Sequence, residues 1–143
     1  MGTIIRVGIL DNYQGAVEVY LKYLAQDSQI EVVGIMQYGE ELEPFLENVQ
    51  VDVLILDVQV ATALDDPNLY PLLHLIPKLL QQYPRLFVLA ISMHNQSTLI
   101  KAFIDIGISG YILKDDRTDI QKLDKVIRTI AQGEKYFGEH VSL

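Results

Sequence analysis

Short apolar runs and amphipathic stretches alternate along the chain, and this pattern predicts five strands that are each followed by a helix. Nearly unbroken apolar runs rich in branched side chains are typical of strands buried on both faces of a parallel sheet. The clearest run covers residues 51–57 and ends at Asp57. Runs of this kind predict strands at residues 4–10, 30–36, 51–57, 86–92 and 110–113.

Apolar residues between these runs recur at helical spacing. Three prolines are expected to modify the helices, because proline lacks the N–H group that a helix interior needs. Pro44 should kink the second helix or shift its start, Pro71 suits a first turn, and Pro77 should bend or interrupt the third helix. The predicted helices cover residues 16–25, 39–49, 69–83, 95–106 and 118–131.

Small and polar residues mark the ends of the later elements. Gly107 and Gly133 are the expected stops of the last two helices, and Thr118 is the expected cap at the start of the last one. Residues 58–68 form the least regular part of the chain. We expect an irregular, acidic segment there.

Strands that are separated by helix-length crossovers must run parallel, with right-handed connections. The pattern therefore predicts an α/β fold, a three-layer, doubly wound, flavodoxin-like sheet of five parallel strands in the order 2-1-3-4-5. A chain of 143 residues fits one domain, residues 1–143, with a sizeable core.

Composition narrows the classes of function. A formal net charge of −8 argues against non-specific binding of nucleic acid or of an anionic membrane surface, and favours a cation such as Mg²⁺ or a basic partner. The absence of cysteine excludes disulfides, thiol catalysis and zinc thiolate sites. The first apolar run is too short for a signal peptide or a membrane span. We expect a cytoplasmic location.

Four polar residues end or directly follow predicted strands: Asp11, Asp57, Ser92 and Lys114. Because the carboxyl ends of parallel strands meet at one edge of the sheet, we expect these residues to share a pocket. Two acids can hold Mg²⁺, which prefers oxygen ligands, and a lysine and a hydroxyl can bind the oxygens of a transferring phosphoryl group. The set therefore suits phosphoryl transfer to the carboxylate of Asp57.

Motifs around these residues cover nearly the whole chain. They are Val-Gly-Ile-Leu-Asp (7–11), Glu-Val-Val-Gly (31–34), Val-Leu-Ile-Leu-Asp (53–57), Val-Leu-Ala-Ile-Ser (88–92), Gly-Tyr-Ile-Leu-Lys (110–114) and Ile-Arg-Thr-Ile-Ala-Gln-Gly (127–133) with Tyr136. With these motifs the chain resembles a response regulator receiver domain of the CheY-like superfamily, and most of all the receivers of NarL/LuxR-type regulators, which carry helix-turn-helix outputs.

The resemblance implies that Asp57 accepts a phosphoryl group from a sensor histidine kinase. Mg²⁺ would be held by Asp57, by Asp11 and by the backbone carbonyl of Gln59. Ser92 would move toward the phosphoryl group and Tyr111 would turn inward with it, which switches partner binding or a transcriptional output. On this interpretation the domain is not an enzyme, beyond catalysing its own phosphorylation and dephosphorylation.

Three features depart from the family pattern. Asn12 replaces the second of two adjacent acids and is a weaker metal ligand. Met93 follows Ser92, where a small residue is usual, and is large enough to cover part of the site. Residues 58–68 replace a short turn. These departures keep a second hypothesis open, a degenerate receiver that serves as a phosphorylation-independent interaction or dimerisation module.

An aspartate-nucleophile phosphatase is a third hypothesis, but such enzymes use a second acid two residues after the nucleophile, where this chain has Gln59. The expected partners are the sensor kinase and a second copy of the chain, with no contact to nucleic acid or membrane by this domain. Because a DNA-binding domain commonly follows in the resembling subfamily, we expect an output domain to be missing from the C-terminal side. A stand-alone receiver is the alternative.

Overall fold

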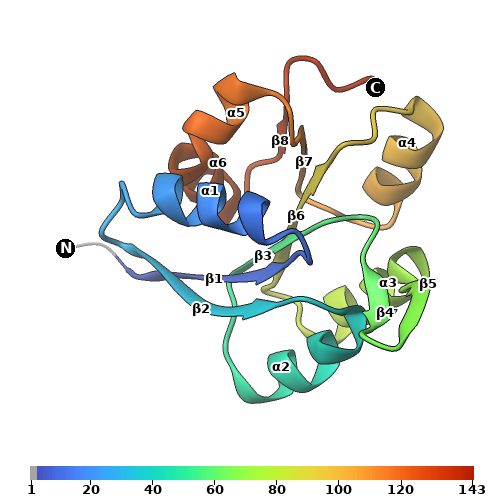
Figure 1. Cartoon of the computed structure of the whole chain (residues 1–143). Coiled ribbons are helices and arrows are strands. Elements are labelled where there is room, and N and C mark those ends of the chain that lie inside the picture. The colour runs from blue at the N-terminus through green and yellow to red at the C-terminus, as the bar shows by residue number, and fades with distance from the viewer. Residues whose placement is uncertain (1–2) are drawn as a thin grey trace.

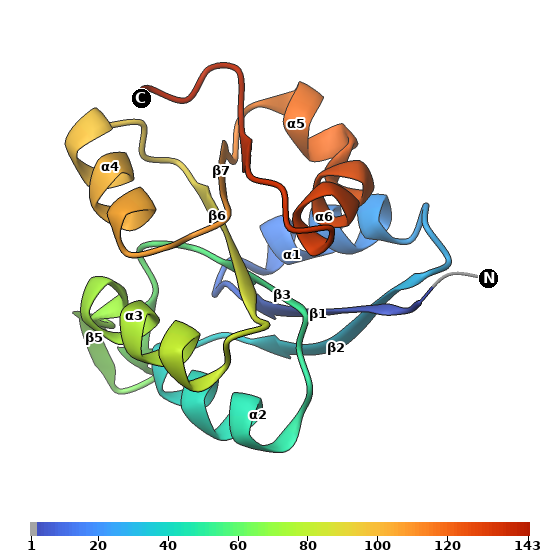
Figure 2. The same ribbon diagram turned by 180° about the vertical axis from the view of Figure 1, so that it is seen from behind.

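A parallel sheet with helices on both faces organises the computed structural model, which describes residues 3–143. The sheet consists of β1 (Ile5–Leu10), β2 (Ile30–Met36), β3 (Val53–Leu56), β6 (Phe87–Ser92), β7 (Gly110–Leu113) and β8 (Tyr136–Phe137). One face is covered by α1 (Gln14–Leu24), α5 (Arg117–Gln121) and α6 (Leu123–Ala131), and the other by α2 (Leu42–Asn48), α3 (Leu72–Gln82) and α4 (Ser97–Asp105) (Figures 1 and 2). Within the described range, no helix combines the length and apolar character needed to cross a lipid bilayer.

The strand order is β2-β1-β3-β6-β7-β8, and all neighbouring pairs in this sheet are parallel. Its first five positions confirm the predicted order. The sixth strand, β8, is an addition that the pattern did not predict. It pairs Tyr136 with Gly110 and Phe137 with Tyr111. Two residues are too few to show a periodic pattern, so only the tertiary contact reveals this strand.

The central strand shows why a continuous apolar run is needed here. Leu54 and Leu56 face the core cluster under α2, α3 and α4, whereas Val53 and Ile55 face the cluster under α1 and α6. All four side chains are fully buried. Alternate residues of a strand point to opposite faces, so a strand covered on both sides must be apolar throughout.

The prolines act differently in their three helices. Pro44 lies in the first turn of α2, which starts at Leu42 after a separate 3₁₀ turn, η1 (Gly39–Glu41). Pro71 is the N-cap of α3. Pro77 lies inside α3, which continues through it to Gln82, so of the two predicted effects, a bend or an interruption, the interruption is wrong. One lost hydrogen bond is outweighed because α3 packs a buried apolar stripe against the sheet.

Residues 58–68 are more regular than predicted. They form most of an antiparallel hairpin of β4 (Ala61–Ala63) and β5 (Asp66–Leu69), which is closed by a hydrogen bond of 2.9 Å from Tyr70 N to Val60 O. Strands of three and four residues are too short to show an alternating pattern, which is why the prediction of an irregular segment was wrong.

Tyr70 anchors this hairpin on the η1–α2 segment. Its ring lies directly on Gly39, where an added Cβ atom would come within 2.0 Å of Tyr70 Cγ. The hydroxyl group lies 3.4 Å from Oε1 of Glu43. The hairpin is therefore packed against the body of the domain and not held by its two ends alone.

The ends of the later helices match the sequence pattern in part. Gly107 and Gly133 follow α4 and α6 with φ values of 104° and 90°, a conformation that favours glycine. The predicted cap Thr118 is wrong, because Asp116 caps α5 by accepting from Thr118 N at 3.1 Å. The last predicted helix is also divided at Lys122 into α5 and α6.

The C-terminal segment runs past β7 toward α4 (Figure 2). The amide group of Asn95 bridges to it, donating to His140 O at 3.0 Å and accepting from Ser142 N at 2.7 Å. His140 Nδ1 lies 2.8 Å from Asp116 Oδ2, and Val141 is buried. The segment is thus attached to the loop that follows β6.

Candidate functional site

The parallel topology brings the polar residues at the strand ends to one edge of the sheet. Asp11 follows β1, Asp57 follows β3, Ser92 ends β6 and Lys114 follows β7. The hydrogen-bond ladder continues beyond the strands, because Asp57 N donates to Leu10 O at 3.0 Å and Lys114 N donates to Ser92 O at 2.8 Å. The backbone therefore fixes the positions from which these side chains extend.

Lys114 lies between the two acids. Its Nζ atom is 3.0 Å from Asp11 Oδ2 and 3.0 Å from Asp57 Oδ2. The exposed fractions of the side chains are 11% for Lys114, 1% for Asp11 and 11% for Asp57. Burial alone would lower the pKa of Lys114, but the hydrogen bonds and charges of the two acids outweigh it and hold this pKa above its usual value.

Each acid also accepts other hydrogen bonds. Asp11 Oδ1 accepts from Tyr13 N at 2.8 Å, and Asp57 Oδ1 accepts from Gln59 N at 3.1 Å. Tyr20 of α1 donates its hydroxyl hydrogen to Asp11 Oδ2, at 3.3 Å. Burial and then the charge of Asp11 raise the pKa of Tyr20 far above its usual value, so the hydroxyl group keeps its proton.

Tyr20 is the residue of this pocket that the sequence interpretation missed. At helical spacing with Val17 and Leu24, it is counted as one more apolar position of α1. The available signal was a hydroxyl-bearing side chain on an otherwise apolar stripe that faces the end of β1.

Ser92, at the end of β6, and Tyr111, in β7, both form hydrogen bonds with His94 in the loop after β6. Both side chains are fully buried. Ser92 Oγ accepts from His94 N at 2.9 Å, and the Tyr111 hydroxyl donates to His94 O at 2.7 Å. Burial is the main cause that raises the pKa of Tyr111. Tyr111 is therefore already inside the protein in this structure, and both residues are linked to the same short loop.

Only a small part of Asp57 reaches solvent, since its side chain is 11% exposed. Met93 is 61% exposed, so the Met93 side chain lies largely in solvent. Asn12 is exposed, and so is Tyr13, whose ring centroid is 5.2 Å from Lys114 Nζ. The exposed Tyr13 ring flanks the lysine at the edge of the pocket.

The donor set fits a hard divalent cation. Mg²⁺ is commonly bound by one or two carboxylates and keeps several waters, so a cluster of three acids is not required. Residues 3–143 contain no group of three or more acidic or histidine side chains placed to hold a metal. Asp11 and Asp57, with one lysine between them, leave one net negative charge in the pocket to attract such an ion.

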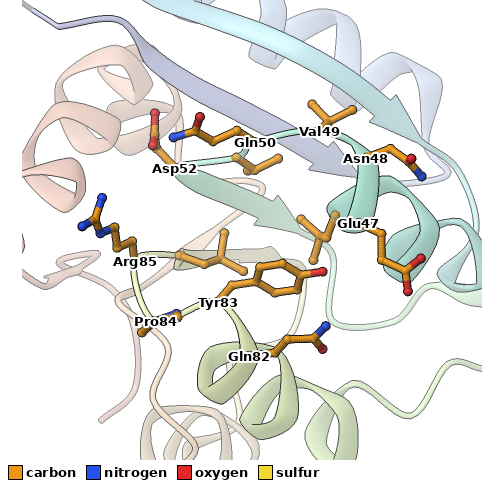
Figure 3. Close-up of a pocket in the computed structure, with 12 residues that line it drawn as sticks. Glu47, Asn48, Val49, Gln50, Asp52, Gln82, Tyr83, Pro84 and Arg85 are labelled. Carbon is orange, nitrogen blue, oxygen red and sulfur yellow. The ribbon is translucent and has the colours of Figure 1, made fainter.

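A cavity of about 570 Å³ lies at the opposite edge of the sheet (Figure 3). It is lined by the segments that precede β3 and β6 and contains neither Asp57 nor Lys114. Asp52, the acid at the start of the central strand, lines it and accepts from Arg6 N at 2.8 Å. Asp52 therefore stabilises the start of the sheet and is separated from the acids at the other edge.

Comparison with known proteins identifies relatives for this arrangement. The model of the family described as response regulator receiver domain matches residues 7–128. The chain is 28% identical over 138 residues to the transcriptional regulatory protein DegU of Brevibacillus brevis, covering 96% of this chain and 55% of DegU. It is 29% identical over 144 residues to the transcriptional regulatory protein MctR of Rhizobium johnstonii, covering 96% of this chain and 60% of MctR. The chain thus spans a little over half the length of these relatives.

A solved structure shows the same architecture. The isolated REC domain of RcsB from Salmonella enterica serovar Typhimurium, in the presence of the phosphomimetic BeF₃⁻, matches with a TM-score of 0.82 at 25% identity. The match covers 97% of this chain and 96% of that one. The similarity therefore extends over the entire fold and includes the edge where Asp11, Asp57 and Lys114 meet.

Proposed function

The chain belongs to the response regulator receiver domain family, and from this premise we propose that Asp57 accepts a phosphoryl group from a sensor histidine kinase. One observation carries the proposal. Lys114 contacts both buried acids at 3.0 Å, so acceptor, second acid and cation are already assembled at one edge of the sheet. The second hypothesis, a phosphorylation-independent module, has no comparable observation in its favour.

In the proposed transfer, a carboxylate oxygen of Asp57 bonds to phosphorus while the bond between phosphorus and the kinase imidazole nitrogen breaks. The electron pair of that bond stays with the nitrogen. Lys114 turns toward the phosphoryl oxygens and neutralises their charge, and the Ser92 hydroxyl binds one of them. Mg²⁺, when held by Asp11, Asp57 and the backbone carbonyl of Gln59, supplies further charge neutralisation.

The contribution of Asn12 to the cation site is weaker. Asn12 could ligate through its amide oxygen or through a water, but it adds no charge. The proposed site therefore has one acid fewer than the usual receiver pattern, and the affinity for Mg²⁺ should be correspondingly lower.

The proposed switch is the loop after β6, which Ser92 and Tyr111 both contact through His94. A phosphoryl group on Asp57 would draw Ser92 toward it, and the contact of both residues with His94 would transmit that movement. The result is a population shift between two states of the domain. On this proposal the domain catalyses at most its own phosphorylation and dephosphorylation.

The proposed partners follow from the relatives. DegU and MctR are transcriptional regulatory proteins, so we expect this chain, as one receiver domain over residues 1–143, to control an output of that kind in a longer protein. The sensor kinase is the first partner and a second copy of the chain is the next. A cytoplasmic location, where a kinase has access to ATP, is part of the proposal.

The test is phosphorylation by a small-molecule donor. The folded chain is incubated with acetyl phosphate and Mg²⁺, and its intact mass is measured. We expect the mass of one phosphoryl group to be added to the wild type, none to Asp57→Asn, and an unchanged gain for the control Asp52→Asn at the other end of β3. A folded wild type that gains no mass would favour the phosphorylation-independent module, and turnover of a phosphate ester would favour a phosphatase.

A further inference from the structure

The hydroxyl group of Tyr20 is a buried polar group that the packing of α1 does not require. Tyr20 is 2% exposed and lies on the apolar stripe of α1 with Val17 and Leu24. A phenylalanine ring would fill the same space, whereas a buried hydroxyl without a partner has an unfavourable free energy. The partner of this hydroxyl is Asp11 Oδ2, 3.3 Å away.

This contact matters because the other side-chain donor to Asp11 is shared. Lys114 lies 3.0 Å from Oδ2 of Asp11 and 3.0 Å from Oδ2 of Asp57. When Lys114 moves toward Asp57, or toward an anion bound there, it leaves Asp11. Tyr20 is fixed by the packing of α1 against the sheet, so its hydrogen bond to Asp11 does not depend on Lys114.

The residue at position 12 makes the orientation of Asp11 more important. Asn12 is exposed and uncharged, so Asp11 is the single carboxylate that the β1–α1 turn supplies to the pocket. Donors that hold a metal-binding carboxylate from outside the coordination sphere fix its orientation, and their loss typically weakens metal affinity by about 10–100-fold.

We propose that Tyr20 is a positioning residue of the cation site, whose hydroxyl group holds the Asp11 carboxylate in the orientation that binds a divalent cation. The Tyr20 hydroxyl thereby compensates in part for the Mg²⁺ affinity that is lost because Asn12 stands in place of an acid. This inference deepens the proposed function and rests on it, because Asp11 is a ligand only if the pocket takes up a cation.

The test removes the hydroxyl group and keeps the ring. The full chain carrying Tyr20→Phe is titrated with Mg²⁺ while the backbone amide signals of Tyr13 and Gln59, which report on the two acids, are followed by NMR. We expect the Kd for Mg²⁺ to rise about 10-fold relative to the wild type. Affinity equal to or tighter than that of the wild type overturns the proposal.

Two variants separate positioning from packing. Tyr70→Phe removes another hydroxyl, which lies 3.4 Å from Glu43 on the surface, and should leave Mg²⁺ binding unchanged. Val17→Ala perturbs the same buried face of α1 and should lower the urea midpoint without weakening Mg²⁺ binding. A loss of Mg²⁺ affinity in either variant that equals the loss in Tyr20→Phe overturns the proposal.

A compensating variant gives a second readout. Adding Asn12→Asp to Tyr20→Phe supplies the missing acid and should recover much of the lost Mg²⁺ affinity, whereas no recovery counts against the proposal. The wild type distinguishes the two levels of the argument. If it binds neither Mg²⁺ nor beryllofluoride, the proposed function fails together with this inference. If it binds both and Tyr20→Phe binds them equally well, only the role of Tyr20 is overturned.

Discussion

The Nζ atom of Lys114 lies 3.0 Å from Oδ2 of Asp57, although 57 positions separate the two residues in the chain. The same atom contacts Asp11 at 3.0 Å. Two carboxylates this close and this buried would repel each other, and the lysine compensates that repulsion. The three side chains are therefore already assembled at one edge of the sheet.

Removal of Lys114 should expose this repulsion. In Lys114→Ala the two carboxylates face each other without a cation, and breaking a buried ion pair from one side typically costs about 3–5 kcal/mol of the free energy of unfolding. Removing one of the two charges removes the repulsion, so the added substitution Asp57→Asn should reduce the deficit. Urea denaturation of Lys114→Ala and of the double variant measures it. A deficit that is equal in both variants would contradict the explanation.

A second acid at position 12 should strengthen cation binding. One more unit charge about 4 Å from a divalent ion contributes roughly 2 kcal/mol in water, or about 30-fold in Kd. Asn12→Asp is therefore expected to bind Mg²⁺ about 30-fold more tightly in a calorimetric titration. Asn48→Asp adds the same charge beside the cavity at the other edge of the sheet. Equal tightening in both variants would show that net charge, and not the pocket, is responsible.

A methyl group at Gly39 should disturb the β4–β5 hairpin. An added Cβ atom would lie 2.0 Å from Cγ of Tyr70, a ring atom that cannot move without shifting the side chain. Overpacking of this kind usually costs about 1–3 kcal/mol, so Gly39→Ala should unfold at a lower urea concentration. Gly15→Ala is the matched control, because its Cβ atom meets nothing within 4 Å and it lies in α1. A fall in stability for Gly15→Ala alone would refute this interpretation.

The C-terminal segment should be attached most firmly at mildly acidic pH. The hydrogen bond with Asp116 raises the pKa of His140, and the same bond lowers the pKa of Asp116. The contact is therefore lost as the pH rises through the raised pKa of His140, and again as it falls through the lowered pKa of Asp116. An NMR titration of the His140 ring, with hydrogen exchange at Ser142 N, follows both transitions. Asp116→Asn should return the pKa of His140 toward its usual value, and a titration unchanged by that substitution would exclude the pairing.

The sequence was most informative where elements are long and repeated. Five apolar runs and the helices between them predicted the order of the first five strands, because parallel crossovers leave few alternatives. β3 and β7 have only four residues each but are continuous apolar runs, whereas β4 and β8 have three and two residues and β5 is mostly polar, so these three strands show no pattern. Asp116 and Thr118 are both cap-forming residues two positions apart, so only the structure decides which one caps α5.

The candidate site was also predicted in part, and again the parallel topology made the prediction possible. Strand ends on parallel strands must share an edge, which is why Asp11, Asp57 and Lys114 could be expected to meet. The sequence gives no signal that one lysine contacts both acids equally. The Tyr20 hydroxyl was missed because a tyrosine at helical spacing carries the same signal as any buried aromatic residue.

The attachment of His140 and Ser142 to Asn95 has a practical side. Anything that follows Leu143, whether a fluorescent protein, an affinity tag or the rest of a longer chain, is therefore coupled through Asn95 to the loop after β6. Ile5, at the start of β1, lies at the edge of the sheet opposite to Asp57, which follows the parallel strand β3. Biosensors built on this domain should therefore carry their labels at the amino end.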